Sequence, residues 1–171
     1  MLRDLWQGTA AGAAATVPMT ALMEVGFQEL PFFEQYSLPP RQITMNAASA
    51  VGVRDDLTAN QALALTVGSH LAYGAGCGGL YTSVVPRAQR GVVSGVGFGL
   101  GVWAGSYLGL LPALGLLSPA TRHPRERTAL MIAAHVVWGG TLGLLTKTRP
   151  KQTASKAVSQ KSRRKSPAMG R

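Results

Sequence analysis

Between Gly91 and Thr121 the chain carries no Lys, Arg, Asp or Glu. An uncharged, mainly apolar stretch of this length is typical of a helix that crosses a bilayer, which needs about 20 residues. We place this span at about 91–111, where Pro112 ends it, and three similar spans at about 5–27, 62–85 and 128–146. The pattern predicts an all-α membrane protein with a four-helix transmembrane bundle over residues 1–146.

The amino-terminal span has an alternative interpretation as a cleaved signal peptide. Such a peptide needs a positive start and a short apolar core. Here Arg3 is offset by Asp4, and Glu24 interrupts the apolar run late. We therefore interpret the segment as a retained span.

The segment between the first two spans contains a second kind of helix, at about 40–52. It follows Pro39 and Pro40, and proline is well tolerated where a helix starts. Ile43, Ala47 and Ala50 then share one face, which predicts a short helix lying on the membrane surface. Just beyond it, the run Asp55–Thr58 supplies side chains that cap the start of the second span.

The net charge of +10 comes mostly from the carboxyl-terminal segment 147–171, which has nine Lys and Arg and no acidic residue. Its polar composition predicts a disordered tail. A free basic tail also suggests nucleic acid, but next to a span it is better explained by cytoplasmic retention and attraction to anionic lipid headgroups. Both termini are therefore predicted to be cytoplasmic, although Arg122, Arg125 and Arg127 on the opposite side count against this orientation.

The glycines of the chain predict which helix faces pack closely. They make up 21 of 171 residues and occur inside the apolar runs, where small residues let helix backbones approach closely. The third span carries two such rows, so we expect it to be the packing centre. The predicted helix-packing glycines are Gly8, Gly12, Gly74, Gly78, Gly91, Gly95, Gly97, Gly99, Gly101, Gly105, Gly109, Gly139 and Gly143.

A histidine pattern occurs twice. His70-Leu71-Ala72-Tyr73-Gly74 is followed by Gly78, and His135-Val136-Val137-Trp138-Gly139 is followed by Gly143. The spacing places histidine, aromatic residue and glycines on one helical face. Each copy would end a hairpin of two spans, so the chain is consistent with two hairpins that repeat in parallel.

Three ionisable groups lie within the spans, namely Glu24, His70 and His135, and we predict a polar cluster at similar depth. Intramembrane ionisable residues are costly and often functional. Three roles stay open: interhelical hydrogen bonding, a proton-linked transport role, and metal or haem ligation. Cys77 has two interpretations, a small packing residue or a reactive thiol. We predict no resident metal or cofactor.

Several strings together resemble a bacterial family of small inner-membrane proteins related to the YagU-like group. The likeness covers about residues 5–146 and implies an inner-membrane location and a topology, not a chemistry. The strings are Val17-Pro18-Met19-Thr20, Leu38-Pro39-Pro40-Arg41-Gln42-Ile43-Thr44, His70-Leu71-Ala72-Tyr73-Gly74, Trp103-Ala104-Gly105-Ser106-Tyr107-Leu108-Gly109, Leu111-Pro112-Ala113-Leu114-Gly115 and His135-Val136-Val137-Trp138-Gly139.

The sequence shows no phosphate loop, zinc spacing, hydrolase motif or dinucleotide fingerprint. The leading hypothesis is a non-enzymatic accessory or scaffold subunit that packs against itself or a larger membrane complex. A small proton-linked transporter or channel that uses Glu24, His70 and His135 is the alternative. An enzyme acting on lipid or quinone is a third hypothesis, for which no catalytic set is found.

Overall fold

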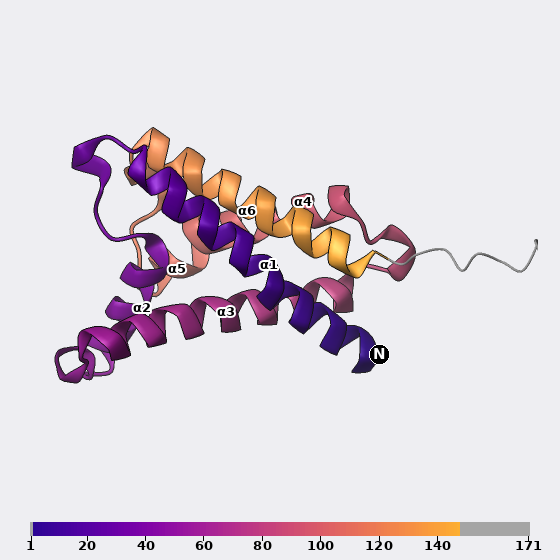
Figure 1. Ribbon diagram of the computed structural model, residues 1–171, viewed down its shortest axis with the longest axis horizontal. Coiled ribbons are helices and arrows are strands. Elements are labelled where there is room, and N and C mark those ends of the chain that lie inside the picture. Colours follow the sequence, from indigo (N-terminus) through magenta and orange to yellow (C-terminus); the bar gives the residue numbers. More distant parts are fainter. Residues whose placement is uncertain (1, 148–171) are drawn as a thin grey trace, which may run out of the picture.

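The computed structural model describes residues 2–147, and this part of the chain consists of helices and the loops that join them. The predicted basic tail lies, after Lys147, outside the described residues. The long helices run back and forth, so that the start of the chain, the 85–91 loop and the end of α6 (Arg125–Thr146) lie at one end of the molecule. The segment containing α2 (Pro39–Ala50) lies at the other end (Figure 1).

Each predicted segment has a helix at nearly the predicted place. The helices are α1 (Leu2–Gln28), α2, α3 (Ala59–Val84), α4 (Val92–Ala104) and α6. The α4 helix continues through a π-helical segment, η4 (Gly105–Leu110), into the short α5 (Leu111–Ala113). Single 3₁₀ turns occupy Phe32–Glu34, Arg54–Asp56, Arg87–Gln89 and Ala120–Arg122.

The predicted cap of the second span is confirmed. The Thr58 backbone N–H donates to Gln61 Oε1 at 2.9 Å, and the Gln61 backbone N–H donates to Thr58 Oγ1 at 3.3 Å. This reciprocal pair satisfies two amide groups that a helix start otherwise leaves without partners.

Three helices in the described residues are long and apolar enough to cross a membrane: α1, the continuous helix Val92–Ala113, and α6. The second of the four expected spans, at about 62–85, corresponds to α3, which has 26 residues but is not in this set. Its glycines, hydroxyl side chains and His70 lower its mean hydropathy. The chain is thus all-helical with three membrane-length helices, and a bundle of four membrane-spanning helices is not established.

Glycines join the helices into two hairpins. In the first hairpin, α1 and α3 lie so close that a Cβ on Gly12 would overlap the carbonyl oxygen of Gly74, and a Cβ on Gly78 would overlap that of Gly8. Because Gly8 faces Gly78 and Gly12 faces Gly74, the two helices are antiparallel.

The second hairpin, formed by α4 and α6, repeats this arrangement. A Cβ on Gly95 would overlap the carbonyl oxygen of Gly139, and a Cβ on Gly143 would overlap that of Gly91. The glycines that the sequence matched between the two halves therefore make corresponding backbone contacts.

The hairpins meet through α1 and α6, and α1 lies between α3 and α6. The Trp138 indole N–H donates to the carbonyl oxygen of Gly12 at 3.1 Å. Our expectation that the third span is the packing centre is wrong, because α4 packs extensively only on α6. Its second glycine row has no neighbour within 4 Å of an added Cβ among the described residues; the row comprises Gly97, Gly101, Gly105 and Gly109.

The two glycine rows of α4 give a matched test. Gly95→Ala should lower the stability of the protein by about 1–3 kcal/mol, since the new methyl group forces two backbones apart. Gly97→Ala should be neutral or slightly stabilising, since its methyl group meets open space and alanine favours a helix by up to about 1 kcal/mol. Thermal unfolding in detergent, followed by circular dichroism, measures both. Equal melting temperatures for the two variants would contradict the interlock.

Candidate functional site

A cavity of about 580 Å³ lies between the two hairpins. Its walls come from α1, α3, α4 with η4, and α6, and α2 covers one side with Pro40, Ile43, Thr44, Ala47 and Ala48. This face of α2 differs slightly from the predicted one, because Ala50 is exposed and does not line the cavity. Small-molecule sites in proteins have volumes of about 300–1,000 Å³, so the cavity has the size of a ligand site.

Both histidines of the repeated pattern line this cavity. His70 on α3 is partly buried, and its Nδ1 lies 3.3 Å from Thr20 Oγ1 on α1. His135 on α6 is buried, and its Nδ1 lies 2.8 Å from the carbonyl oxygen of Met131. The structure thus brings together two residues that are 65 positions apart in the sequence, one from each hairpin.

Glu24 lies apart from this pair. It is exposed on α1 and lines a second cavity of about 480 Å³, which His70 also lines but His135 does not. The predicted polar cluster is therefore divided between two cavities, with His70 on the wall of both. Among the described residues, no three His, Cys, Asp or Glu side chains form a group that could hold a metal ion.

The π-helical segment supplies a polar wall that the sequence did not predict. Ser106 and Tyr107 are both buried and both line the cavity. Ser106 Oγ lies 2.7 Å from the hydroxyl of Tyr73 on α3, which ties the two hairpins together across the cavity. The Tyr107 ring packs edge-on against the His135 imidazole at 5.8 Å between centroids. Short π-helical segments occur frequently at functional sites, but no sequence pattern predicts this one.

Cys77 is a free thiol on the cavity wall, partly buried among apolar neighbours. Such a position fits its interpretation as a small packing residue better than that of an exposed reactive group.

A buried arginine holds the loop that carries α2. Arg127, on the first turn of α6, is 1% exposed and donates hydrogen bonds to the carbonyl oxygens of Glu34, Tyr36 and Ser37. Its guanidinium also stacks on the Tyr36 ring, 3.8 Å from the centroid. From the sequence, Arg127 is only a charge that counts in the orientation of the chain, and no local pattern predicts this structural role.

The same loop buries a carboxyl group. Glu34 is 2% exposed, and its Oε2 atom has no hydrogen-bond partner among the described residues. Burial and the nearby charge of Glu126 raise the pKa of Glu34, and Arg127 offsets this only in part. The loop therefore contains a carboxyl group whose charged form is disfavoured.

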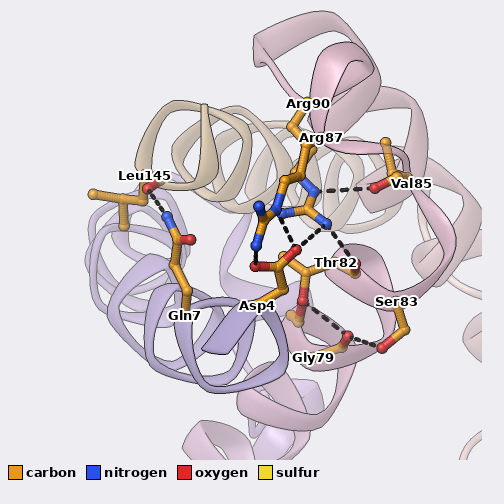
Figure 2. A network of polar contacts seen from close by, with 10 residues as sticks. Asp4, Gln7, Gly79, Thr82, Ser83, Val85, Arg87, Arg90 and Leu145 are labelled. Atoms are coloured by element: carbon orange, nitrogen blue, oxygen red, sulfur yellow. Dashed lines mark hydrogen bonds and ion pairs between the residues drawn. The ribbon is translucent and has the colours of Figure 1, made fainter. Parts of the chain in front are cut away.

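At the opposite end of the molecule, charges cluster where the chain starts. Figure 2 shows the Asp4 carboxylate on α1 facing the guanidinium groups of Arg87 and Arg90. Arg90 also donates to the carbonyl oxygens of Thr82 and Val85, at 2.7 and 3.0 Å. The Asp4 carboxylate raises the pKa of Arg87. These contacts tie the loop between the two hairpins to the first turns of α1.

Comparison with known proteins does not place this chain in a family. No protein-family model matches it, and neither a curated protein nor a solved structure is significantly similar to it. The resemblance to the YagU-like group therefore stays a prediction.

The buried carboxyl group predicts a pH dependence. Because the pKa of Glu34 is raised in the folded state, its protonation favours folding, and the contribution of Glu34 to stability should increase as the pH falls through the raised pKa toward the ordinary value of 4.5. Glu34→Gln should be more stable than the wild type at pH 7 and should lack this part of the gain. Thermal unfolding between pH 5 and 8 measures the effect. The exposed Glu29→Gln is the matched control and should keep the wild-type pH profile; an unchanged profile in Glu34→Gln would contradict the assignment.

Proposed function

We propose that the protein is a non-enzymatic integral membrane protein that binds a lipophilic molecule in the cavity between its two hairpins. One observation carries the proposal: a cavity of ligand size is lined mainly by apolar side chains and receives a few polar groups from both hairpins. Binding sites for small molecules have this composition, in which an apolar wall encloses the ligand and a few polar groups fix its orientation.

The position of the cavity supports a ligand that arrives from the lipid. Five of its lining residues are exposed, namely Val51, Val53, Leu65, Ser69 and Tyr73, so the cavity reaches the protein surface. Tyr73 lies near the middle of α3, at the level where hydrocarbon would surround the protein. A molecule dissolved in the bilayer would therefore reach the cavity without crossing water.

The other hypotheses have weaker support. A proton relay through Glu24, His70 and His135 would have to pass from one cavity to the other through His70, because Glu24 and His135 line different cavities. The role of accessory or scaffold subunit stays a prediction. The open glycine row of α4, from Gly97 to Gly109, would be the surface for a second copy or a larger partner.

We further propose an orientation in a bacterial inner membrane with both termini in the cytoplasm. The start of α1, the 85–91 loop that contains Arg87 and Arg90, and the end of α6 lie at one end of the molecule, and the sequence that follows Lys147 is basic. An excess of Lys and Arg is typical of cytoplasmic loops. On the other side, Arg127 is buried against loop carbonyl groups.

Cysteine labelling tests the orientation. In a Cys77→Ser background, a membrane-impermeant maleimide added to intact cells should label Asp55→Cys and should not label Ala88→Cys. Both positions are exposed and lie at opposite ends of the molecule, so each serves as the control for the other. Labelling of position 88 alone would invert the proposed orientation.

Binding is tested by filling the cavity. Ala47→Trp places a large ring in the cavity wall and should lower binding of the lipophilic fluorophore 1-aminoanthracene at least roughly tenfold, because the ring competes for the same apolar volume. Ala50→Trp, on the same helix but exposed, should bind like the wild type. The measurement is fluorescence of protein-loaded nanodiscs against empty ones. Equal signals from loaded and empty nanodiscs would contradict a ligand cavity.

A further inference from the structure

The hydrogen bonds of the two cavity histidines determine which ring nitrogen carries the proton. The carbonyl oxygen of Met131 can only accept, so His135 Nδ1–H is the donor in their 2.8 Å contact. Thr20 has one hydroxyl proton, which it donates to the carbonyl oxygen of Thr16 at 2.8 Å. In the contact between Thr20 Oγ1 and His70, the histidine Nδ1–H is therefore the donor as well.

A neutral imidazole that donates through Nδ1 is a hydrogen-bond acceptor at Nε2. Neither Nε2 atom has a hydrogen-bond partner among the described residues, and both rings line the same cavity. Each hairpin thus contributes one histidine with an Nε2 acceptor to the wall of a space that is otherwise mainly apolar, and His70 also borders the second cavity. An acceptor left without a donor in such surroundings costs free energy, which a ligand that brings donors recovers.

We infer that the ligand is a lipophile with two hydroxyl donors on a flat aromatic body, that is, a molecule of the quinol type. This inference rests on the proposed function. Two acceptors match two hydroxyl groups, and the rings of Tyr107 and Trp138 provide aromatic walls for a flat ring system. The oxidised quinone has the same skeleton but carries only acceptor oxygens, which would face the lone pairs of the two Nε2 atoms.

A comparison of how tightly the quinol and quinone forms of one compound bind tests the ligand type independently of the proposed function. The probes are 2-methyl-1,4-naphthoquinol and its quinone, partitioned anaerobically between protein-loaded and empty nanodiscs. The wild-type protein should bind the quinol at least roughly tenfold more tightly, the effect of one buried hydrogen bond. If the quinone binds as tightly as the quinol, the inference fails while the proposed function stands. If neither form binds and 1-aminoanthracene does not bind, both fail.

Substitutions of the two histidines test which side chain accepts a hydrogen bond from the quinol. His135→Phe keeps a flat ring but removes the acceptor, so it should lower quinol affinity roughly tenfold and leave quinone affinity unchanged. His135→Gln retains an acceptor oxygen and should restore part of the preference. His123→Phe, which does not line the cavity, is the control. Unchanged quinol affinity in both His135→Phe and His70→Phe, or a haem in the purified protein held by these imidazoles, would overturn the inference. The wild-type comparison of the two redox forms decides the question even if a variant does not fold.

Discussion

Two helices can bring their backbones into contact only where neither carries a side chain between them, and this condition organises the whole chain. Gly12 and Gly74 satisfy it in the first hairpin, and Gly95 and Gly139 satisfy it in the second. Helices held so closely at one point diverge away from it. Figure 1 shows α1 and α3 crossing and then separating toward the end that carries α2. The cavity lies on that side, and α2 and the side chains of Met19, Met23 and Leu65 line it.

This geometry explains why histidine and glycine recur together. His70 is one helical turn from Gly74, and His135 is one turn from Gly139, in each case on the side toward α2 and the cavity. Each histidine therefore stands where its helix begins to separate from its partner, on the face that points inward. A side chain one turn further along, at the glycine, would meet the neighbouring helix: a Cβ on Gly74 would overlap the Thr16 hydroxyl, and a Cβ on Gly139 would overlap the carbonyl oxygen of Gly95. The repeated spacing encodes both a close contact and the polar group beside it.

The sequence predicted where the helices lie and which glycines of α1, α3 and α6 pack closely, because both depend on local periodicity. It did not predict the partners of each glycine row: Gly97 and Gly101 have the same spacing as Gly95 and Gly99 but meet no described neighbour. The spacing of glycines shows that a helix face allows close packing, but it does not show which helix packs against that face. The sequence also grouped Glu24 with the histidines by depth alone. The cavity that Glu24 lines depends instead on its angular position around the α1 axis, which places it in the second cavity.

The parts that sequence reasoning missed are those made by tertiary contacts. In the sequence, Arg127 is one more charge near a helix start. Its role becomes evident only in the structure, where it donates to the carbonyl oxygens of Glu34 and Tyr36. The π-helical segment at Ser106 and Tyr107 has no compositional signature, and it becomes evident only as a change in hydrogen bonding. Both features position the cavity, because Arg127 fixes the loop that leads to α2 and Ser106 joins η4 to Tyr73.

A cavity of this kind selects its ligands by different interactions in lipid than in water. In water, the hydrophobic effect would drive any apolar molecule into it, but lipid tails are as apolar as the wall and compete for the same space. Apolar area therefore contributes little to selectivity within the bilayer. The free energy that separates a ligand from an acyl chain must come from the few polar atoms that the cavity presents. In the described residues these include the Nε2 atoms of His70 and His135, and the small number of such atoms is what makes their hydrogen-bonding character decisive.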